Sequence, residues 1–378
     1  CCTIWRCCAT NSVAVKGSRR LRIGIDVGRA LRGRDGVATY SQQLARGLIE
    51  LDRSIELRLF DLDGGGCRAE SVGALLGDLP ANVRVAHATR SEVADLDLFH
   101  CTAYRLPPPG PRRLLFTVHD LTFLSHPEFH TLANRVRCLT SMAQGLARGA
   151  AVVAVSETSR RECARLLALP DASVEVIPPA VSPLFCPSRH PTRDAEVATG
   201  LGATKPFVLN VGSIEPRKNL AGVLDCLDAL PDDLAHDLLL VLVASAGWHD
   251  REIRLRLDPL IADGRVLLVG DLREEELVSL YRSAEAMVYP SLVEGFGLPV
   301  IEAMACGTPV VTSDRSSMRE VAGDAALLVD PDDPQSIADG VARAVRDTET
   351  RDRLVTMGLD RSRGYANETV TRRVLELY

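Results

Sequence analysis

The sequence predicts an α/β protein made of two doubly wound, Rossmann-like domains that face a cleft. Three observations predict this fold class. The chain has 378 residues, long enough for two hydrophobic cores rather than one. Strand patterns alternate with helix patterns, which is typical of parallel sheets. The alternation starts at Leu21, breaks in a proline-rich stretch from Pro178 to Pro206, and restarts at Phe207.

In the first half, Leu21–Val27 alternates apolar residues with Arg, Gly and Asp and predicts a strand. A loop with several glycines follows over 28–36, and then a helix pattern over Val37–Leu51. The further predicted strands are Ile55–Phe60, Leu96–His100, Leu114–Val118, Ala151–Val155 and Val174–Ile177, with helices at Thr131–Leu146 and Glu157–Leu167.

The second half repeats the scheme. Its predicted strands are Phe207–Val211, Leu238–Val243, Val266–Val269, Ala286–Tyr289, Pro309–Thr312 and Ala326–Val329. Helices are expected to begin at Asn219, Asp250, Glu274 and near Leu298, and terminal helices follow the last strand. We expect residues 1–20 outside the fold, domains at 21–185 and 206–360, a linker at 186–205, and a C-terminal helix at 361–378 that packs back on the first domain.

The composition argues against a nucleic-acid-binding protein, a membrane-spanning protein and a zinc protein. The net charge of -6 gives no reason to expect a nucleic-acid partner, and no apolar run is long enough for a membrane-spanning helix. Of the 11 cysteines, Cys1, Cys2, Cys7 and Cys8 crowd the N-terminus, and the others lack the C-x-x-C spacing of a zinc site. We interpret this N-terminal group as part of a segment outside the fold. The two alternatives are that these cysteines bind a metal or accept a lipid.

The segment after Tyr289 is the most informative one. A loop rich in glycine carries Glu294, and a helix then begins with Pro299 in its first turn. The unpaired amides at such a helix start suit a phosphate. Glu294 and, along the helix, Glu302 offer acceptor oxygens for the vicinal diols of two sugars. The alternative for the two glutamates is a solvated helix surface.

A second segment follows the first strand of the same domain. Arg217 and Lys218 stand just past that strand's carboxyl end, on the side of the predicted cleft. Two positive charges before a helix start oppose the helix dipole unless an anion lies between them. The pattern therefore favours a diphosphate over a plain basic pair.

Together, the Gly-x-x-x-Pro-Arg-Lys-Asn segment ending at Asn219 and the Glu294-x7-Glu302 segment resemble the retaining GT-B glycosyltransferases of family 4. The resemblance spans Leu21 to Tyr378, and the mannosyl- and rhamnosyltransferase-like enzymes of surface-polysaccharide assembly are the most similar subgroup. One difference is Val243-Ala244-Ser245, where such enzymes usually have Val-Gly-Pro. The resemblance implies a first domain that binds the acceptor and a second that binds the nucleotide sugar.

His119 and Asp120 follow a buried strand and should face the cleft. A lone histidine there would more often be structural, but the resemblance implies that His119 approaches the reacting carbon. The alternative to an acceptor-side role for Asp120 is that it caps a helix or stabilises a turn. For Ser156, a helix cap and a contact with the acceptor explain the residue equally well. The implied catalytic residues are His119, Glu294, Arg217 and Lys218. The implied donor-binding residues are Gly36, Gly212, Arg217, Lys218, Gly295, Phe296, Gly297, Leu298 and Glu302. The implied acceptor-side residues are Tyr104, Asp120 and Ser156.

No metal and no cofactor are expected. The pairs Asp61/Asp63 and Asp95/Asp97 have the Asp-x-Asp spacing of a metal site, but their setting indicates chance, and the dinucleotide fingerprint G-x-G-x-x-G is absent. The expected reaction is transfer of a hexose from a GDP- or UDP-linked donor to a glycan or lipid-linked acceptor, in the cytoplasm, with at most peripheral membrane association. The rival functions are a nucleotide-sugar epimerase and a non-catalytic sugar-nucleotide-binding subunit.

Overall fold

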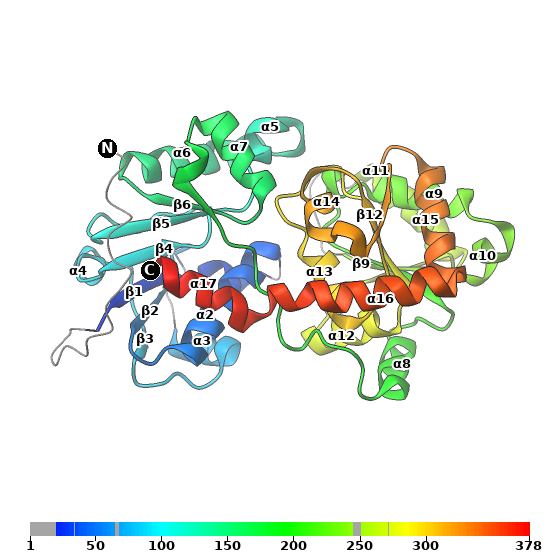
Figure 1. Ribbon diagram of the computed structural model, residues 1–378, viewed down its shortest axis with the longest axis horizontal. Helices are drawn as coiled ribbons and strands as arrows, with labels where there is room; N and C mark the ends of the chain where they lie inside the picture. Colours follow the sequence, from blue (N-terminus) through cyan, green and yellow to red (C-terminus); the bar gives the residue numbers. More distant parts are fainter. Residues whose placement is uncertain (1–19, 34, 65–67, 245–250, 271) are drawn as a thin grey trace.

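A computed structural model of the chain describes residues 20–33, 35–64, 68–244, 251–270 and 272–378. It shows two domains beside one another along the long axis, each a sheet with helices on both faces (Figure 1). Every pairing between the named strands is parallel. The predicted fold class is therefore confirmed.

The N-terminal sheet has seven strands in the order β3-β2-β1-β4-β5-β6-β7. Its central strands are buried on both faces, as expected of a parallel sheet covered by helices. The strands are β1 (Arg22–Asp26), β2 (Glu56–Phe60), β3 (Val83–Val85), β4 (Leu98–Cys101), β5 (Arg113–Val118), β6 (Ala151–Ala154) and β7 (Val174–Val176).

Two groups of helices cover this sheet. One face packs against α2 (Gly36–Leu51) and α17 (Asn367–Leu377), and the other against α4 to α7. The remaining helices of this half are α1 (Gly28–Arg32), α3 (Ala69–Leu76), α4 (Arg90–Ala94), α5 (Thr122–Ser125), α6 (Leu132–Ala147) and α7 (Glu157–Leu167), with 3₁₀ turns at Pro127–Phe129 and Asp171–Ser173.

The C-terminal sheet has six strands in the order β10-β9-β8-β11-β12-β13. They are β8 (Phe207–Val211), β9 (Leu239–Val243), β10 (Val266–Val269), β11 (Ala286–Tyr289), β12 (Val310–Ser313) and β13 (Leu327–Val329). The helices are α8 (Pro191–Gly200), α9 (Leu220–Ala229), α10 (Asp232–Asp237), α11 (Arg251–Ala262), α12 (Glu274–Ser283), α13 (Leu298–Cys306), α14 (Ser316–Ala322), α15 (Pro334–Arg346) and α16 (Thr348–Ser362), with 3₁₀ turns at Pro216–Lys218, Gly323–Ala325 and Arg363–Tyr365.

Both sheets reverse their strand order beside the first strand of the domain. The reversal lies between β1 and β4 in one sheet and between β8 and β11 in the other. Ligands of open parallel sheets bind outside the carboxyl ends of the strands at such a point. The loops after β8 and β11, at the reversal point of the C-terminal sheet, are therefore expected to form a ligand site.

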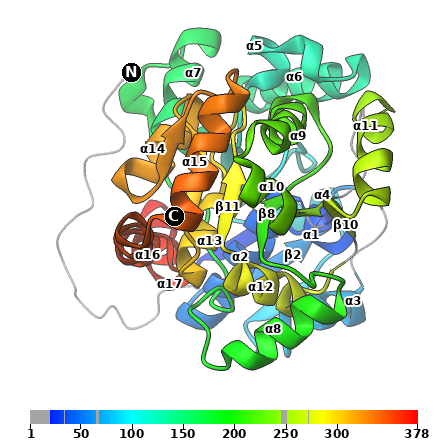
Figure 2. The ribbon, with the colours of Figure 1, turned by 90° about the vertical axis from the view of Figure 1, so that its right-hand side faces the viewer.

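The chain crosses between the domains twice. It leaves the first domain after β7, and it returns through α16 and α17, which Figure 2 shows nearly end-on. Asn367, at the start of α17, donates to the carbonyl oxygen of Gln43 in α2 at 2.8 Å, and the Tyr378 hydroxyl lies 2.6 Å from Nδ1 of His100. The last helix is thus part of the N-terminal domain's core.

Each predicted strand is present within two residues of its expected ends. Several elements were not predicted. They are the short edge strand β3, the short helices α1, α3, α4, α5, α10 and α14, and α8, which lies inside the expected linker and packs against α12. Residues 1–19, with their cysteine cluster, lie outside the described residues, as does Ser245. Within the described ranges, no helix combines the length and apolar character needed to cross a bilayer.

Candidate active site

The loops after β8 and β11 meet at the reversal point of the C-terminal sheet. The β8 loop ends in the 3₁₀ turn that carries Arg217 and Lys218, and the β11 loop carries Glu294. The two loops are joined by the backbone, because Leu292 N donates to the carbonyl oxygen of Arg217 at 2.8 Å. The sheet topology thus brings together residues about 76 positions apart in the sequence.

The Glu294 carboxylate is the centre of this cluster. It is 7% exposed and accepts a hydrogen bond from Nη1 of Arg217 at 2.5 Å. Its other oxygen accepts from the Lys218 ammonium and from the Tyr289 hydroxyl, the latter at 2.8 Å. Ser291 adds a weaker contact at 3.3 Å. Both carboxylate oxygens are therefore held by donors.

The cations set the charge state of Glu294. Burial alone would raise the pKa of this carboxyl, but the charges of Arg217 and Lys218 lower it to about 2. Burial lowers the pKa of the Lys218 ammonium, and its pairing with Glu294 opposes that effect. Glu294 is thus ionised at any physiological pH.

Glu215 supplies a second carboxylate that the sequence interpretation missed. It is 7% exposed and accepts from Nε of Arg217 at 2.8 Å. The pKa of Arg217 is raised because its two carboxylate partners outweigh the effect of burial. The signal was its position two residues before Arg217. Gly212 packs against the stem of Lys218, where an added Cβ would lie 3.8 Å from the Lys218 Cδ.

Two helix starts face one another beside this cluster. Gly297 precedes α13 in a left-handed conformation (φ +98°), and an added Cβ there would lie 2.2 Å from Met318. Gly36 begins α2 in the other domain, and its Cβ position lies 3.9 Å from the Leu298 side chain. No side chain caps the start of α13, so its first amide groups are available to an anion. The start of α2 differs, because the Asp35 carboxylate caps it by accepting from Ala38 N at 2.9 Å.

Glu302 lies apart from these contacts, in the second turn of α13. Its carboxylate is 8% exposed and accepts from the Tyr281 hydroxyl at 2.9 Å. Burial raises its pKa to about 7, despite the hydrogen bond from Tyr281. Glu302 is therefore a group that changes charge near neutral pH. The predicted donor residue Phe296 packs on Tyr365, with ring centroids 5.5 Å apart.

His119 follows β5 and lies where the two domains touch. Its Nε2 is 2.7 Å from the carbonyl oxygen of Thr102, so this nitrogen is the donor. The ring of Tyr40 packs edge-on against it at 4.9 Å, and burial lowers the pKa of His119. A neutral His119 presents Nδ1 as a hydrogen-bond acceptor.

The contact between the domains runs through the glycine after Glu294. An added Cβ on Gly295 would lie 1.8 Å from the carbonyl oxygen of His119. Ser156 donates to the Gly295 carbonyl oxygen at 2.6 Å, while its oxygen accepts from Ser159 N at 2.9 Å. Ser159 in turn contacts both carbonyl oxygens, that of His119 at 3.1 Å and that of Gly295 at 3.2 Å. Ser156 is thus a helix cap that also joins the domains.

The other predicted acceptor-side residues bond to their own domain. Asp120 accepts from the amide and hydroxyl of Thr122 at 3.0 and 2.6 Å, which starts α5. Tyr104 donates to the carbonyl oxygen of Asp120. These contacts hold the loop after β5 in place.

The Asp-x-Asp pairs are occupied by arginines. Asp61 pairs with Arg32 and Asp63 with Arg105, while Asp95 pairs with Arg22 and Arg58. Asp97 accepts from the backbone amide of Arg22 at 3.0 Å. Among the described residues, no group of three or more His, Cys, Asp or Glu side chains is arranged to hold a metal ion.

Known families match most of the chain. The model described as "Glycosyl transferases group 1" matches residues 192–360, and "Glycosyltransferase Family 4" matches residues 34–183. The chain is 30% identical to O-antigen chain mannosyltransferase B of Escherichia coli, over 91% of this chain and 95% of that protein. It is 27% identical to serotype-specific mannosyltransferase WbdA of Escherichia coli, over 66% of this chain and 31% of that protein.

Solved structures share the fold. Anabaena Alr3699/HepE in complex with UDP and glucose has a TM-score of 0.74 at 16% identity, over 94% of this chain and 99% of that one. Sucrose-phosphate synthase from Thermosynechococcus elongatus also has a TM-score of 0.74, at 22% identity, over 95% of this chain and 98% of that one. At these identities the likeness concerns the fold alone.

Proposed function

Because the chain belongs to family 4 of the GT-B glycosyltransferases, we propose that it moves a mannose- or rhamnose-like hexose from a GDP- or UDP-linked donor to a glycan or lipid-linked acceptor in polysaccharide synthesis. The anomeric configuration is retained in this proposal, and no metal takes part. The observation that carries it is the buried Glu294, Arg217 and Lys218 cluster at the reversal point of the sheet, beside His119.

In this proposal the leaving diphosphate is neutralised by protein groups. An arginine has five N–H donors and a lysine has three. Arg217 and Lys218 can therefore keep their hydrogen bonds to Glu294 and also donate to phosphate oxygens. The start of α13, which no side chain caps, adds backbone amides. These charges would stabilise the leaving group as its bond breaks.

Glu294 is proposed to orient the donor sugar. A pKa of about 2 makes it a poor proton donor, and cations on both oxygens make it a poor nucleophile. Its remaining lone pairs can accept from sugar hydroxyls. This favours attack from the face of the leaving group over a covalent glycosyl-enzyme.

The proposed step is balanced without a further reactant. The acceptor oxygen bonds to the anomeric carbon as the bond from that carbon to the phosphate oxygen breaks. The acceptor's hydroxyl proton passes to the departing phosphate oxygen. Nδ1 of His119 accepts a hydrogen bond from a donor-sugar hydroxyl near the reacting carbon, and Glu302 accepts from the ribose.

A panel of GDP- and UDP-linked hexoses, each offered with a mannose-terminated acceptor, tests the proposal. We expect one donor to be consumed only with acceptor, in EDTA as well as in buffer. The proton–carbon coupling of the product should show the donor's anomeric configuration. Activity that EDTA abolishes and Mg²⁺ restores, or an inverted product, would contradict the mechanism.

The same panel separates the rival functions. An epimerase would change the donor sugar without any acceptor, and a non-catalytic subunit would bind donor but leave it intact. Lys218→Ala removes a charge-assisted contact to the leaving group, worth about 1.5–3 kcal/mol. Turnover of this variant at the wild-type rate with saturating donor would rule out the assigned role.

A further inference from the structure

The outer face of α6 carries large apolar side chains exposed to solvent. Leu132, Val136 and Leu139 are 71%, 55% and 47% exposed. Their spacing of four and three residues places them on one side of the helix. The core-facing side is a separate one, made by Cys138 and Met142. The three exposed residues are therefore not needed to pack α6 against the domain. We refer to Leu132, Val136 and Leu139 as the apolar stripe.

Two arginines flank the stripe. At 100° per residue, Arg135 and Arg137 lie on opposite sides of Val136, and α6 contains no acidic residue. From position 98 to position 156 the chain has six arginines and only two acidic residues, Asp120 and Glu128, although its overall net charge is -6. Two of the six, Arg105 and Arg112, pair with Asp63 and Asp97, which lie outside that stretch. Such a local excess of positive charge beside an apolar stripe fits an anionic surface.

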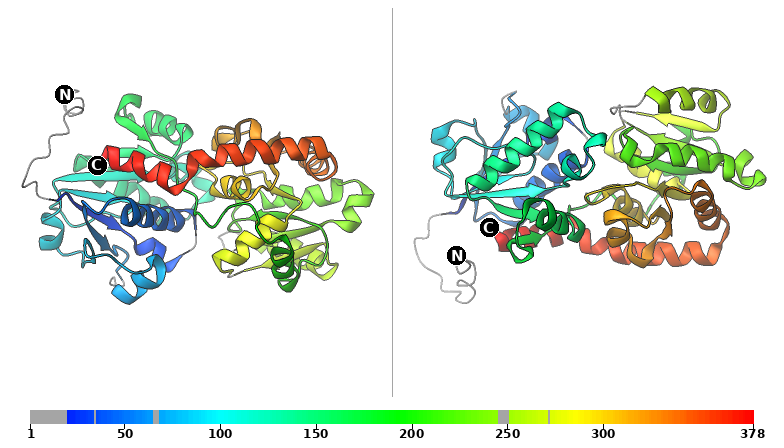
Figure 3. Two further views of the ribbon diagram at one scale, coloured as in Figure 1. Left: turned by 60° about the horizontal axis from the view of Figure 1, so that its bottom comes forward. Right: turned by 90° about the horizontal axis from the view of Figure 1, so that it is seen from above.

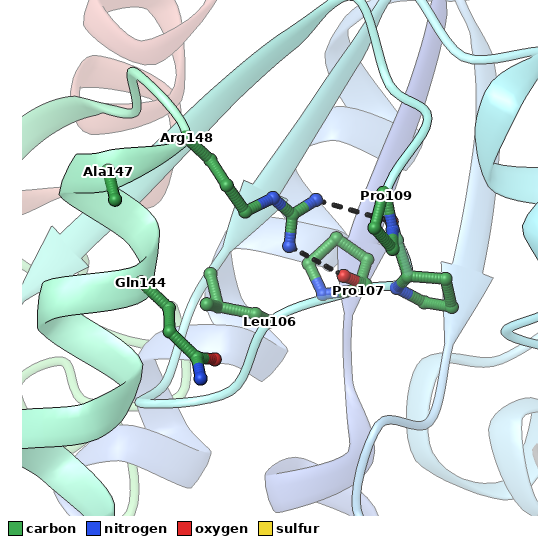
Figure 4. A pocket seen from close by; sticks show the side chains of 7 residues that line it. Leu106, Pro107, Pro109, Gln144, Ala147 and Arg148 are labelled. Atoms are coloured by element: carbon green, nitrogen blue, oxygen red, sulfur yellow. Dashed lines mark hydrogen bonds between the residues drawn. The ribbon is translucent and has the colours of Figure 1, made fainter.

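A hollow continues this surface at the far end of α6. It is lined by Leu106, the three prolines 107–109, Gln144, Ala147 and Arg148 (Figure 4). The Arg148 guanidinium donates to the carbonyl oxygens of Pro107 and Pro108, at 2.8 and 3.2 Å. Its partners are neutral, so its charge stays available to an anionic group. The hollow is mainly apolar with one cation, like the stripe.

The start of the stripe is joined to the loop that carries His119. His130, two residues before Leu132, lies 2.7 Å from the Thr122 hydroxyl, which donates to Asp120 next to His119. Seen from above, α6 crosses the face of the N-terminal domain (Figure 3, right). A molecule held along α6 would thus have its end beside the acceptor side of the site.

We propose that the outer face of α6 docks on an anionic lipid bilayer, with the apolar stripe in the interface and Arg137 against lipid phosphates. The orientation toward a lipid-linked acceptor rests on the proposed function, whereas binding to the bilayer does not. A helix with this composition lies in the plane of the interface, with its apolar side chains at the headgroup–acyl boundary.

Flotation of the purified full chain tests the proposal, with vesicles of phosphatidylcholine alone or mixed with phosphatidylglycerol. Binding should need the anionic lipid. The double variant Leu132→Ser/Leu139→Ser should lose roughly tenfold in partitioning. Its matched control is Leu255→Ser, because Leu255 is 65% exposed on α11 of the other domain. Arg137→Gln should lose about fivefold, and Arg363→Gln, whose side chain is 79% exposed, should not.

Transfer assays keep this proposal apart from the proposed function. The stripe variant should act normally on a lipid-free acceptor and poorly on one embedded in anionic vesicles. Wild-type protein that does not float, or stripe variants that float equally well, would overturn the docking surface. So would a dimer that the stripe variant breaks without change in flotation. If the protein floats as expected but transfers sugar to no acceptor, only the proposed function is contradicted.

Discussion

The carboxylate of Glu320, in α14 of the C-terminal domain, caps the start of α7 in the N-terminal domain at Thr158. It accepts from the amide and hydroxyl of Thr158, both at 3.0 Å, and from the amide of Glu157 at 2.8 Å. A carboxylate at a helix N-terminus is favoured by the unpaired amides and by the helix dipole. The second domain therefore completes a helix of the first.

Removing this cap should loosen the register between the domains. We expect Glu320→Ala to lower the free energy of unfolding by about 0.5–2 kcal/mol, the cost of a lost cap, and to lower kcat because the two domains are no longer held in one register. Distances between one label in each domain should broaden in the same variant. Glu157→Gln is the control, because its side chain is 46% exposed and pairs with Arg160 of its own helix. Equal kcat values for the two variants would argue against a role for the interdomain cap.

Gly295 provides a sharper test of the contact between the two domains. An alanine Cβ would lie 1.8 Å from the carbonyl oxygen of His119, so the domains or the loop must move. We expect Gly295→Ala to reduce transfer at least about a hundredfold, because misplacing catalytic groups by an ångström has that effect. Gly73→Ala is the control, since among the described residues no atom outside its own stretch of α3 lies within 4 Å of its Cβ position. A fully active Gly295→Ala enzyme would show that the two loops need not touch.

Stability should depend on pH through Glu302. Its pKa rises from 4.5 to about 7 in the folded chain, so the unfolded chain ionises first and stability falls as pH increases across that interval. Each pH unit contributes up to about 1.4 kcal/mol. Glu302→Gln cannot ionise, so its melting temperature should exceed that of the wild type at pH 8 and match it near pH 4.5.

Asp26 must be separated from this effect. Burial raises its pKa to about 6, so it also lowers stability as pH rises. Only the difference between wild type and Glu302→Gln isolates Glu302, because both proteins keep Asp26. If that difference stays constant from pH 4.5 to pH 8, Glu302 does not titrate as the structure indicates. In transfer assays the same variant should raise the donor KM more than it lowers kcat.

The sequence pointed to Arg217, Lys218 and Glu294, which the structure brings together, because these residues lie in local patterns. Arg217 and Glu294 follow strands whose ends must meet at the reversal point of a parallel sheet. Glu320 and Ser159 carry no such pattern, since their partners lie 162 and 136 residues away. Contacts of this kind come from how two finished domains dock, which no periodicity encodes.

Two of the missed elements, β3 and α8, were missed for local reasons. The three residues of β3 are too few to show an alternation. The helix α8 begins with Pro191, and a proline-rich context argues for a linker. Proline is in fact well tolerated at the first position of a helix. What fixes α8 is tertiary: its buried Asp194 accepts from Ser279 of α12 at 2.9 Å.

The last prediction concerns Glu294. Glu294→Gln keeps the shape of the side chain but removes the charge that Arg217 and Lys218 share. The two cations would then be left with one buried carboxylate, Glu215, so the pKa of Lys218 should fall further. We expect kcat to drop by roughly 10²–10³, because the sugar is no longer held for attack from the leaving-group face.

The pH profile distinguishes this orienting role from proton transfer. With a pKa of about 2, wild-type Glu294 contributes no acid limb above pH 4, so Glu294→Gln should lower the whole profile without shifting it. Its residual product should keep the anomeric configuration of the wild-type product. A variant that loses an ionisation near neutral pH would make Glu294 a proton carrier. A variant whose product inverts would make it the covalent nucleophile, because water or acceptor would then attack the donor directly from the opposite face.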